Sequence, residues 1–229
     1  MKVALCTPSL TGPTKPYMEA LKASIEPLRA AGFDVFTEQE FGCPYISEAR
    51  AKMLRKALDK KAEIIVFIDY DISWSPEDLL KLIRTDGDVI AGLYRFKEDE
   101  EHYMGILIDG PNHQPVVKGT PENPLIKAEC VPAGFLKITP HAVNRFMEAF
   151  PELVYGPRYC PYVDLFNHGA HKGVWWGEDY AFSRRWREAG GEIWIRPDLT
   201  LSHHSAEKVF KGNFHEFMMR QPGGSMEGK

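Results

Sequence analysis

Several features are scarce in this chain of 229 residues, and each scarcity excludes a class of protein. Its four cysteines, Cys6, Cys43, Cys130 and Cys160, include no C-x-x-C pair, which argues against a zinc ribbon or a thioredoxin-like motif. The first residues form too short an apolar run for a signal peptide, and no stretch approaches the ~18 apolar residues of a membrane helix. The sequence therefore predicts a reduced cytoplasmic protein with no membrane span.

A large excess of one charge sign is also missing. The chain has 28 Lys or Arg and 32 Asp or Glu, a formal net charge of −4, so it offers no broad positive field to a nucleic acid backbone. Only a local nucleic acid contact is left open. In contrast, 13 Phe, 9 Tyr and 5 Trp supply ample apolar surface, which excludes global disorder.

Strand-like and helix-like segments alternate along the chain. Residues 64–68 are all apolar and mostly β-branched, which is typical of a strand buried on both faces of a parallel sheet. The alternation predicts an α/β layered fold with a mixed, mainly parallel sheet flanked by helices. We expect strands at 3–6, 33–36, 64–68, 88–94 and 193–195, and helices at 16–31, 47–60, from Ser75, at 140–150 and at 178–189.

The rest of the chain departs from this alternation. Residues 97–132 contain short strand-like pieces between Pro, Gly and Asn, and predict an antiparallel insertion. Residues 151–174 predict an aromatic-rich loop. The sequence shows no linker, so we expect one domain over 1–220 followed by a disordered tail at 221–229.

Asp69 and Asp71 form the sharpest local feature, a D-x-D pair at the end of the apolar strand. Ligands of open α/β sheets bind at the carboxyl ends of strands. Residues i and i+2 of an extended chain point the same way, so both carboxylates can face one hard cation. A divalent ion there could bridge a diphosphate and neutralise its charge as it leaves.

Two further features lie towards the C-terminus. Glu178 and Asp179 begin a helix directly after Trp175 and Trp176, which favours a general base whose pKa is raised by apolar neighbours, although ordinary helix capping explains the acids equally well. Adjacent histidines in residues 203–204 follow an alternating run, so at most one of them faces a given site.

Together these features resemble a GT-A-fold glycosyltransferase, and in particular the small family-two-like transferases of bacteria and phages. The resemblance covers roughly residues 2–205. It is carried by the strand-terminal D-x-D, the G-E-D-Y-x-F helix start and the L-x-H element, with support from Thr7-Pro8-Ser9, Glu48-Ala49-Arg50 and Ala133-Gly134-Phe135-Leu136.

The resemblance implies a role for each matching residue. Asp69 and Asp71 would hold Mn²⁺ or Mg²⁺ against the donor diphosphate, with His203 as third ligand. Ser205 stands where the family usually has Gly, and His204 remains an alternative ligand. The catalytic base would be Asp179, with Glu178 as competitor.

The resemblance also implies a donor site. Thr7, Pro8 and Ser9 would line the nucleoside pocket, with Tyr70 between the two aspartates. Arg50 would reach the base or the diphosphate, although Ala51 replaces the family's usual Asn. Gly134 would lie in the segment that passes under the sugar and the acceptor.

The implied reaction moves a sugar from a nucleotide-diphosphate donor, such as a UDP- or GDP-sugar, to an acceptor hydroxyl with inversion. The acceptor is open and includes a glycan or a modified nucleobase in DNA. The setting would be the cytoplasm of a bacterium or a phage-infected cell. The alternatives are a non-catalytic carbohydrate-binding protein and a haloacid-dehalogenase-like phosphatase, in which the first Asp is a nucleophile.

Overall fold

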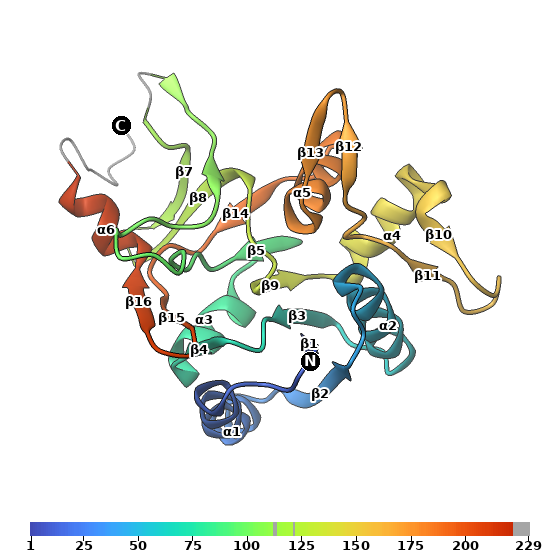
Figure 1. Cartoon of the computed structure of the whole chain (residues 1–229), viewed down its shortest axis with the longest axis horizontal. Coiled ribbons are helices and arrows are strands. Elements are labelled where there is room, and N and C mark those ends of the chain that lie inside the picture. The colour runs from blue at the N-terminus through green and yellow to red at the C-terminus, as the bar shows by residue number, and fades with distance from the viewer. Residues whose placement is uncertain (112–113, 121, 222–229) are drawn as a thin grey trace.

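A computed structural model describes residues 1–111, 114–120 and 122–221. Within them a nine-stranded sheet forms the centre of the molecule, in the order β2-β1-β3-β9-β5-β14-β8-β6, with β7 beside β8 (Figure 1). The sheet strands are β1 (Lys2–Ser9), β2 (Asp34–Phe41), β3 (Ile64–Ile68), β5 (Val89–Ala91), β6 (Ile106–Leu107), β7 (Val117–Thr120), β8 (Asn123–Cys130), β9 (Phe135–Ile138) and β14 (Ile193–Ile195).

The sheet is mixed, as predicted. Strand β1 pairs in parallel with β2 and β3, and β5 pairs in parallel with β14. Strand β9 lies antiparallel between β3 and β5, and β8 is antiparallel to β14, β6 and β7. All the sheet strands except β8 and β9 therefore run in one direction. The sequence pattern does not predict β9, whose first two residues, Phe135 and Leu136, belong to the segment expected beneath the sugar.

Helices cover both faces of the sheet. They are α1 (Lys15–Ala30), α2 (Ile46–Asp59), α3 (Pro76–Arg84), α4 (Pro140–Ala149), the 3-10 helix η2 (Pro151–Leu153), α5 (Glu178–Glu188) and α6 (Phe214–Arg220). None of the described helices combines the length and apolar character that a membrane crossing needs.

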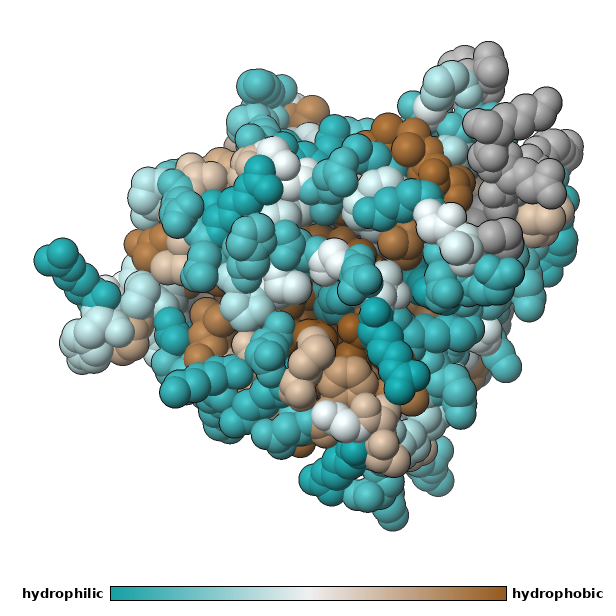
Figure 2. Space-filling view, turned by 180° about the vertical axis from the view of Figure 1, so that it is seen from behind, coloured by the Kyte–Doolittle hydropathy of each residue, from teal (hydrophilic) through white to brown (hydrophobic). Residues whose placement is uncertain are grey.

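Strand β3 shows why both faces are covered. Ile65 and Phe67 pack with α2, α4 and α5, while Ile64, Val66 and Ile68 pack with α1 and α3. All five side chains are buried, which confirms the predicted two-sided strand. The outer surface differs: Figure 2 shows a face with mostly hydrophilic side chains and separate apolar patches.

Among the residues that the structure describes, three smaller sheets lie outside the central one. Strands β4 (Ile72–Trp74), β15 (Thr200–His204) and β16 (Val209–Asn213) form one of them. Strands β10 (Val154–Tyr155) and β11 (Tyr162–Val163) form a second, and β12 (Gly169–His171) and β13 (Val174–Trp176) form a hairpin that projects beside α5 (Figure 1). Residues 151–174, predicted as a loop, therefore contain short regular elements. The predicted disordered tail lies outside the described residues beyond Gln221.

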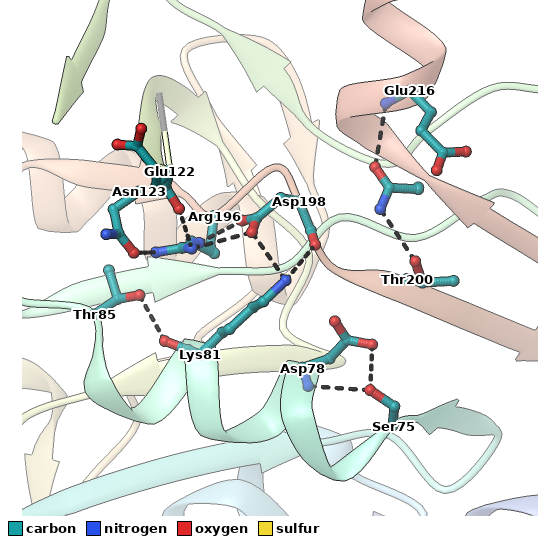
Figure 3. Close-up of polar contacts among 11 residues, drawn as sticks. Ser75, Asp78, Lys81, Thr85, Glu122, Asn123, Arg196, Asp198, Thr200 and Glu216 are labelled. Carbon is teal, nitrogen blue, oxygen red and sulfur yellow. Dashed lines mark hydrogen bonds and ion pairs between the residues drawn. The ribbon is translucent and has the colours of Figure 1, made fainter. Parts of the chain in front are cut away.

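A polar cluster connects α3 to the segment that leads into β15 (Figure 3). Lys81 forms an ion pair with Asp198 at 3.0 Å, and Arg196 bonds the same carboxylate at 3.0 Å. A hollow of about 630 Å³ lies beside this cluster. Because Lys81 and Arg196 are already paired with Asp198, the cluster acts as an anchor for the chain that enters β15.

Candidate active site

Asp69 and Asp71 lie immediately after β3, where the sequence places them. The Asp69 N–H donates to the carbonyl oxygen of Gly134 at 3.0 Å, which ties the end of β3 to the segment before β9. The carbonyl oxygen of Asp71 accepts a 2.8 Å bond from the His204 N–H. The antiparallel pairing of β4 with β15 therefore brings the two histidines next to the D-x-D pair.

The two histidines point in opposite directions, as predicted. His203 Nδ1 lies 2.8 Å from the carbonyl oxygen of Arg95, which can only accept, so Nδ1 carries the proton. His203 Nε2 then faces Asp71 Oδ2 at 3.5 Å. His204 Nε2 instead lies 2.7 Å from Ser73 Oγ, and burial lowers the pKa of its imidazole. Only His203 faces the carboxylate.

Lys97 also contacts Asp71, and no pattern in the sequence predicts this contact. Its Nζ lies 2.5 Å from Asp71 Oδ2, the oxygen that His203 Nε2 also faces. Burial raises the pKa of the Asp71 carboxyl, but the hydrogen bonds with His203 and Lys97 outweigh it, and the pKa lies below the ordinary value. Asp71 is therefore held as a carboxylate.

Arg50 is a buried connection between two parts of the site. Its guanidinium bonds Asp69 Oδ1 at 2.9 Å and Glu178 Oε1 at 3.0 Å, and lies 4.9 Å from the centre of the Phe166 ring. Its side chain is only 1% exposed. Burial alone would lower the pKa of Arg50, but the carboxylates of Asp69 and Glu178 raise it. The guanidinium therefore fixes the end of β3 to the start of α5.

Asp179 is the acid that Arg50 leaves unpaired at the start of α5. Its Oδ1 accepts a 2.8 Å bond from the Tyr180 N–H. Burial and the neighbouring Glu178 carboxylate raise the pKa of Asp179 to about 6, against the lowering effect of Arg50. The two adjacent acids thus differ: Glu178 forms an ion pair, whereas Asp179 can take up a proton near neutral pH.

Position 134 requires glycine, because the side chains of Tyr94 and Asp69 lie too close to leave room for a Cβ atom. A Cβ atom there would lie 2.3 Å from Tyr94 Oη and 2.6 Å from Asp69 Oδ2. Burial raises the pKa of the Tyr94 hydroxyl well above its ordinary value, and the charges of Asp69, Asp179 and Asp71 contribute to the net rise. The close packing at Gly134 therefore places the buried Tyr94 hydroxyl near the Asp69 carboxylate.

A cavity of about 270 Å³ lies over the D-x-D pair. Pro8, Ser9, Tyr70 and both aspartates line it, and all five are among the residues expected to bind a donor. Other residues that line it are Leu10, Cys43, Pro44, Ile46, Ala49, Tyr94, Met104 and His203.

Three residues that were expected at the donor site do not line the cavity: Thr7, Arg50 and Gly134. Thr7 is fully buried and its hydroxyl hydrogen-bonds that of Tyr17, so its side chain faces α1. Arg50 is occupied by its two carboxylates, so in this structure it supports Asp69. Ser9 is the last residue of β1 and lines the cavity.

The predicted set of three metal ligands is only partly assembled. Asp71 and His203 face each other, whereas Asp69 is paired with Arg50. In the part of the chain that the structure describes, no three His, Cys, Asp or Glu side chains gather closely enough to hold a metal ion. Two protein ligands still suit Mg²⁺ or Mn²⁺ when substrate phosphate and water complete the coordination.

No protein-family model and no curated protein matches the chain. Among solved structures, the chain is similar to a glycosyltransferase involved in glycosylation of the major capsid of PBCV-1, with 11% identity, a TM-score of 0.35 and 63% of each chain covered. It is also similar to Drosophila β-1,4-galactosyltransferase 7 in complex with manganese, UDP-Gal and xylobiose, with 15% identity, a TM-score of 0.47, and coverage of 96% of this chain and 79% of that one.

A third similar structure is S. aureus TarS, with 13% identity, a TM-score of 0.44, and coverage of 95% of this chain and 63% of that one. The chain thus spans 63% of the length of the capsid glycosyltransferase and of TarS. Likeness at TM-scores below 0.5 does not decide the activity, which depends on the chain's own residues.

Proposed function

We propose that the chain is a glycosyltransferase that moves a sugar from a nucleotide-diphosphate donor to an acceptor hydroxyl with inversion. One observation carries the proposal: Arg50 joins Asp69 to Glu178, so the D-x-D pair and the protonatable Asp179 meet at one edge of the sheet. A cation-binding carboxylate and a base are the two groups that this reaction needs.

The donor would lie in the cavity over the D-x-D pair. Pro8 and Ser9 would contact the nucleoside, and Tyr70 lies between the aspartates. Asp71 and His203 would hold Mn²⁺ or Mg²⁺, because the Arg95 carbonyl engages Nδ1 of the imidazole and Nε2 faces Asp71 Oδ2 at 3.5 Å. When bound, the ion would neutralise the charge that develops on the leaving diphosphate.

Asp179 would act on the acceptor. The acceptor oxygen passes its proton to the Asp179 carboxylate and forms a bond to the anomeric carbon. The bond from that carbon to the diphosphate oxygen breaks, and its electron pair leaves on the phosphate. A pKa of about 6 places Asp179 close to the value at which a general base is most effective near neutral pH. Because the acceptor oxygen attacks the anomeric carbon from the side opposite the leaving diphosphate, the configuration at that carbon is inverted.

The remaining side chains position these groups. Glu178 and Asp69 are held by the buried Arg50, so the distance between the donor end and the base is fixed before substrate arrives. Gly134 lets Tyr94 and Asp69 approach closely beneath the cavity.

A thermal-shift screen with Mn²⁺ and UDP-, GDP-, CMP- and dTDP-sugars tests the proposal. A donor that binds only the native state raises its melting temperature. We expect one nucleotide class to stabilise the protein and release of free sugar to require the metal. Asp71→Asn should lose both effects, while the matched variant Asp86→Asn, on an exposed loop, should keep them.

The outcomes separate the alternatives. Binding of a sugar without its nucleotide, and no release, would indicate a carbohydrate-binding protein. Hydrolysis of phosphate monoesters that depends on Asp69 would indicate a phosphatase.

A further inference from the structure

Lys97 occupies the position at Asp71 where a divalent ion would bind. Its ammonium reaches Asp71 Oδ2 at 2.5 Å, and His203 Nε2 faces the same oxygen at 3.5 Å. The Asp71 side chain is 11% exposed, whereas that of Lys97 is 36% exposed. The ammonium therefore reaches from the solvent side onto a nearly buried carboxylate, and a metal ion and the ammonium cannot both take that oxygen.

The backbone around Lys97 is fixed. The guanidinium of Arg95 donates to the carbonyl oxygens of residues 98–100 at 3.1–3.3 Å, and the Arg95 carbonyl accepts from His203 Nδ1. One loop thus orients the imidazole and delivers the ammonium. Only the flexible side chain of Lys97 has to move for Asp71 to become free.

Resting on the proposed function, we propose that Lys97 is a resident cation that neutralises Asp71 in the free protein and transfers to the donor diphosphate when the metal binds. A lysine ammonium is a point charge on a flexible stem, and it binds phosphate oxygens from many directions. The divalent ion takes over Asp71 and His203, and the displaced ammonium pairs with a phosphate oxygen. Lys97 therefore disfavours metal alone and favours the diphosphate.

The two effects have opposite signs, which a merely structural lysine would not produce. Lys97→Met removes the charge and keeps most of the side-chain length. We expect the variant to bind Mn²⁺ alone about tenfold more tightly, because Asp71 is no longer occupied, and to bind UDP or GDP at saturating Mn²⁺ about tenfold more weakly, because a charged hydrogen bond is lost. Lys97→Arg should restore nucleotide binding, and Lys22→Met, an exposed helix lysine, should change neither.

Titration calorimetry of each variant with Mn²⁺, UDP and GDP decides the inference, with circular dichroism to establish that each is folded. If the wild type binds metal and nucleotide but Lys97→Met shifts neither, or weakens both, Lys97 is not the resident cation and the proposed function stands. If the wild type binds neither ligand, the proposed function and the inference both fail.

Discussion

Replacing Asp179 by Asn should abolish transfer and also make the protein more stable at neutral pH. The variant keeps an oxygen that can accept the 2.8 Å bond from the Tyr180 N–H, but it removes a charge from a partly buried position. Burial and the Glu178 carboxylate raise the pKa of Asp179 from 3.8 to about 6, so the ionised form is disfavoured in the folded state. The base is therefore maintained at a cost in stability.

The size of this cost follows from proton linkage. One pKa unit corresponds to about 1.4 kcal/mol, so the shift amounts to about 3 kcal/mol at pH 7. Partial solvent access screens the charge, and we expect a gain of about 1–2 kcal/mol in the variant, or roughly 2–8 °C in melting temperature.

The sign can be checked against pH. Between pH 3.8 and about 6, folded Asp179 holds a proton that the unfolded chain has released, so wild-type stability falls as pH rises through this window. Asn does not titrate. The stability difference between variant and wild type should be small near pH 4 and reach its full value above about pH 6.5.

Urea unfolding at pH 4, 5.5 and 7.5 measures the difference. Glu178→Gln is the contrasting variant: it weakens the bond to the buried Arg50 and should be less stable than wild type. If Asp179→Asn were no more stable than wild type at pH 7.5, or its advantage did not change with pH, the raised pKa and the assignment of the base would both be wrong.

Three further predictions follow from the same geometry. The kcat/KM for transfer should rise with pH to a plateau with a midpoint near 6, falling to about a tenth of the plateau at pH 5, as a pH–rate profile would show. Arg50→Met should cost about 3–5 kcal/mol in urea unfolding, because Asp69 and Glu178 lose their buried partner; a loss below 1 kcal/mol would contradict this role. His203→Ala should weaken Mn²⁺ binding in calorimetry, whereas His204→Ala should leave the affinity within about twofold and reduce stability by about 1–3 kcal/mol, because Ser73 loses its partner.

Local patterns predicted most of the scaffold. The limits of β3 follow from five apolar residues in a row, and α3 begins after Ser75 because Ser75 Oγ accepts the Asp78 N–H at 3.1 Å and Pro76 suits the first turn. Strands β4 and β9 were not predicted, and their pairing partners, β15 and β3, lie far away in the sequence.

The sequence by itself determined that carboxylates follow a two-sided buried strand, that a second acid pair begins a helix, and that two adjacent histidines point to opposite sides. These features depend on residues within one strand or one turn, where the 2-residue and 3.6-residue periods operate. The lining of the cavity by Pro8 and Ser9 was expected only from the family resemblance, and the cavity itself joins segments that lie far apart in the sequence.

The tertiary structure alone decided which of the two adjacent acids, Glu178 or Asp179, forms the ion pair with Arg50. It also decided which of the two adjacent histidines faces Asp71. Arg50 reaches Glu178 across 128 positions and leaves Asp179 unpaired, and β15 pairs with β4 so that His203 faces Asp71. Lys97 contacts Asp71, which lies 26 positions away in the sequence, and no pattern in the segment around Lys97 predicts this contact. A buried charge needs a partner of opposite charge, and the packing of distant elements decides which residue is close enough to be that partner. That choice depends on sheet topology, which local periodicity does not contain.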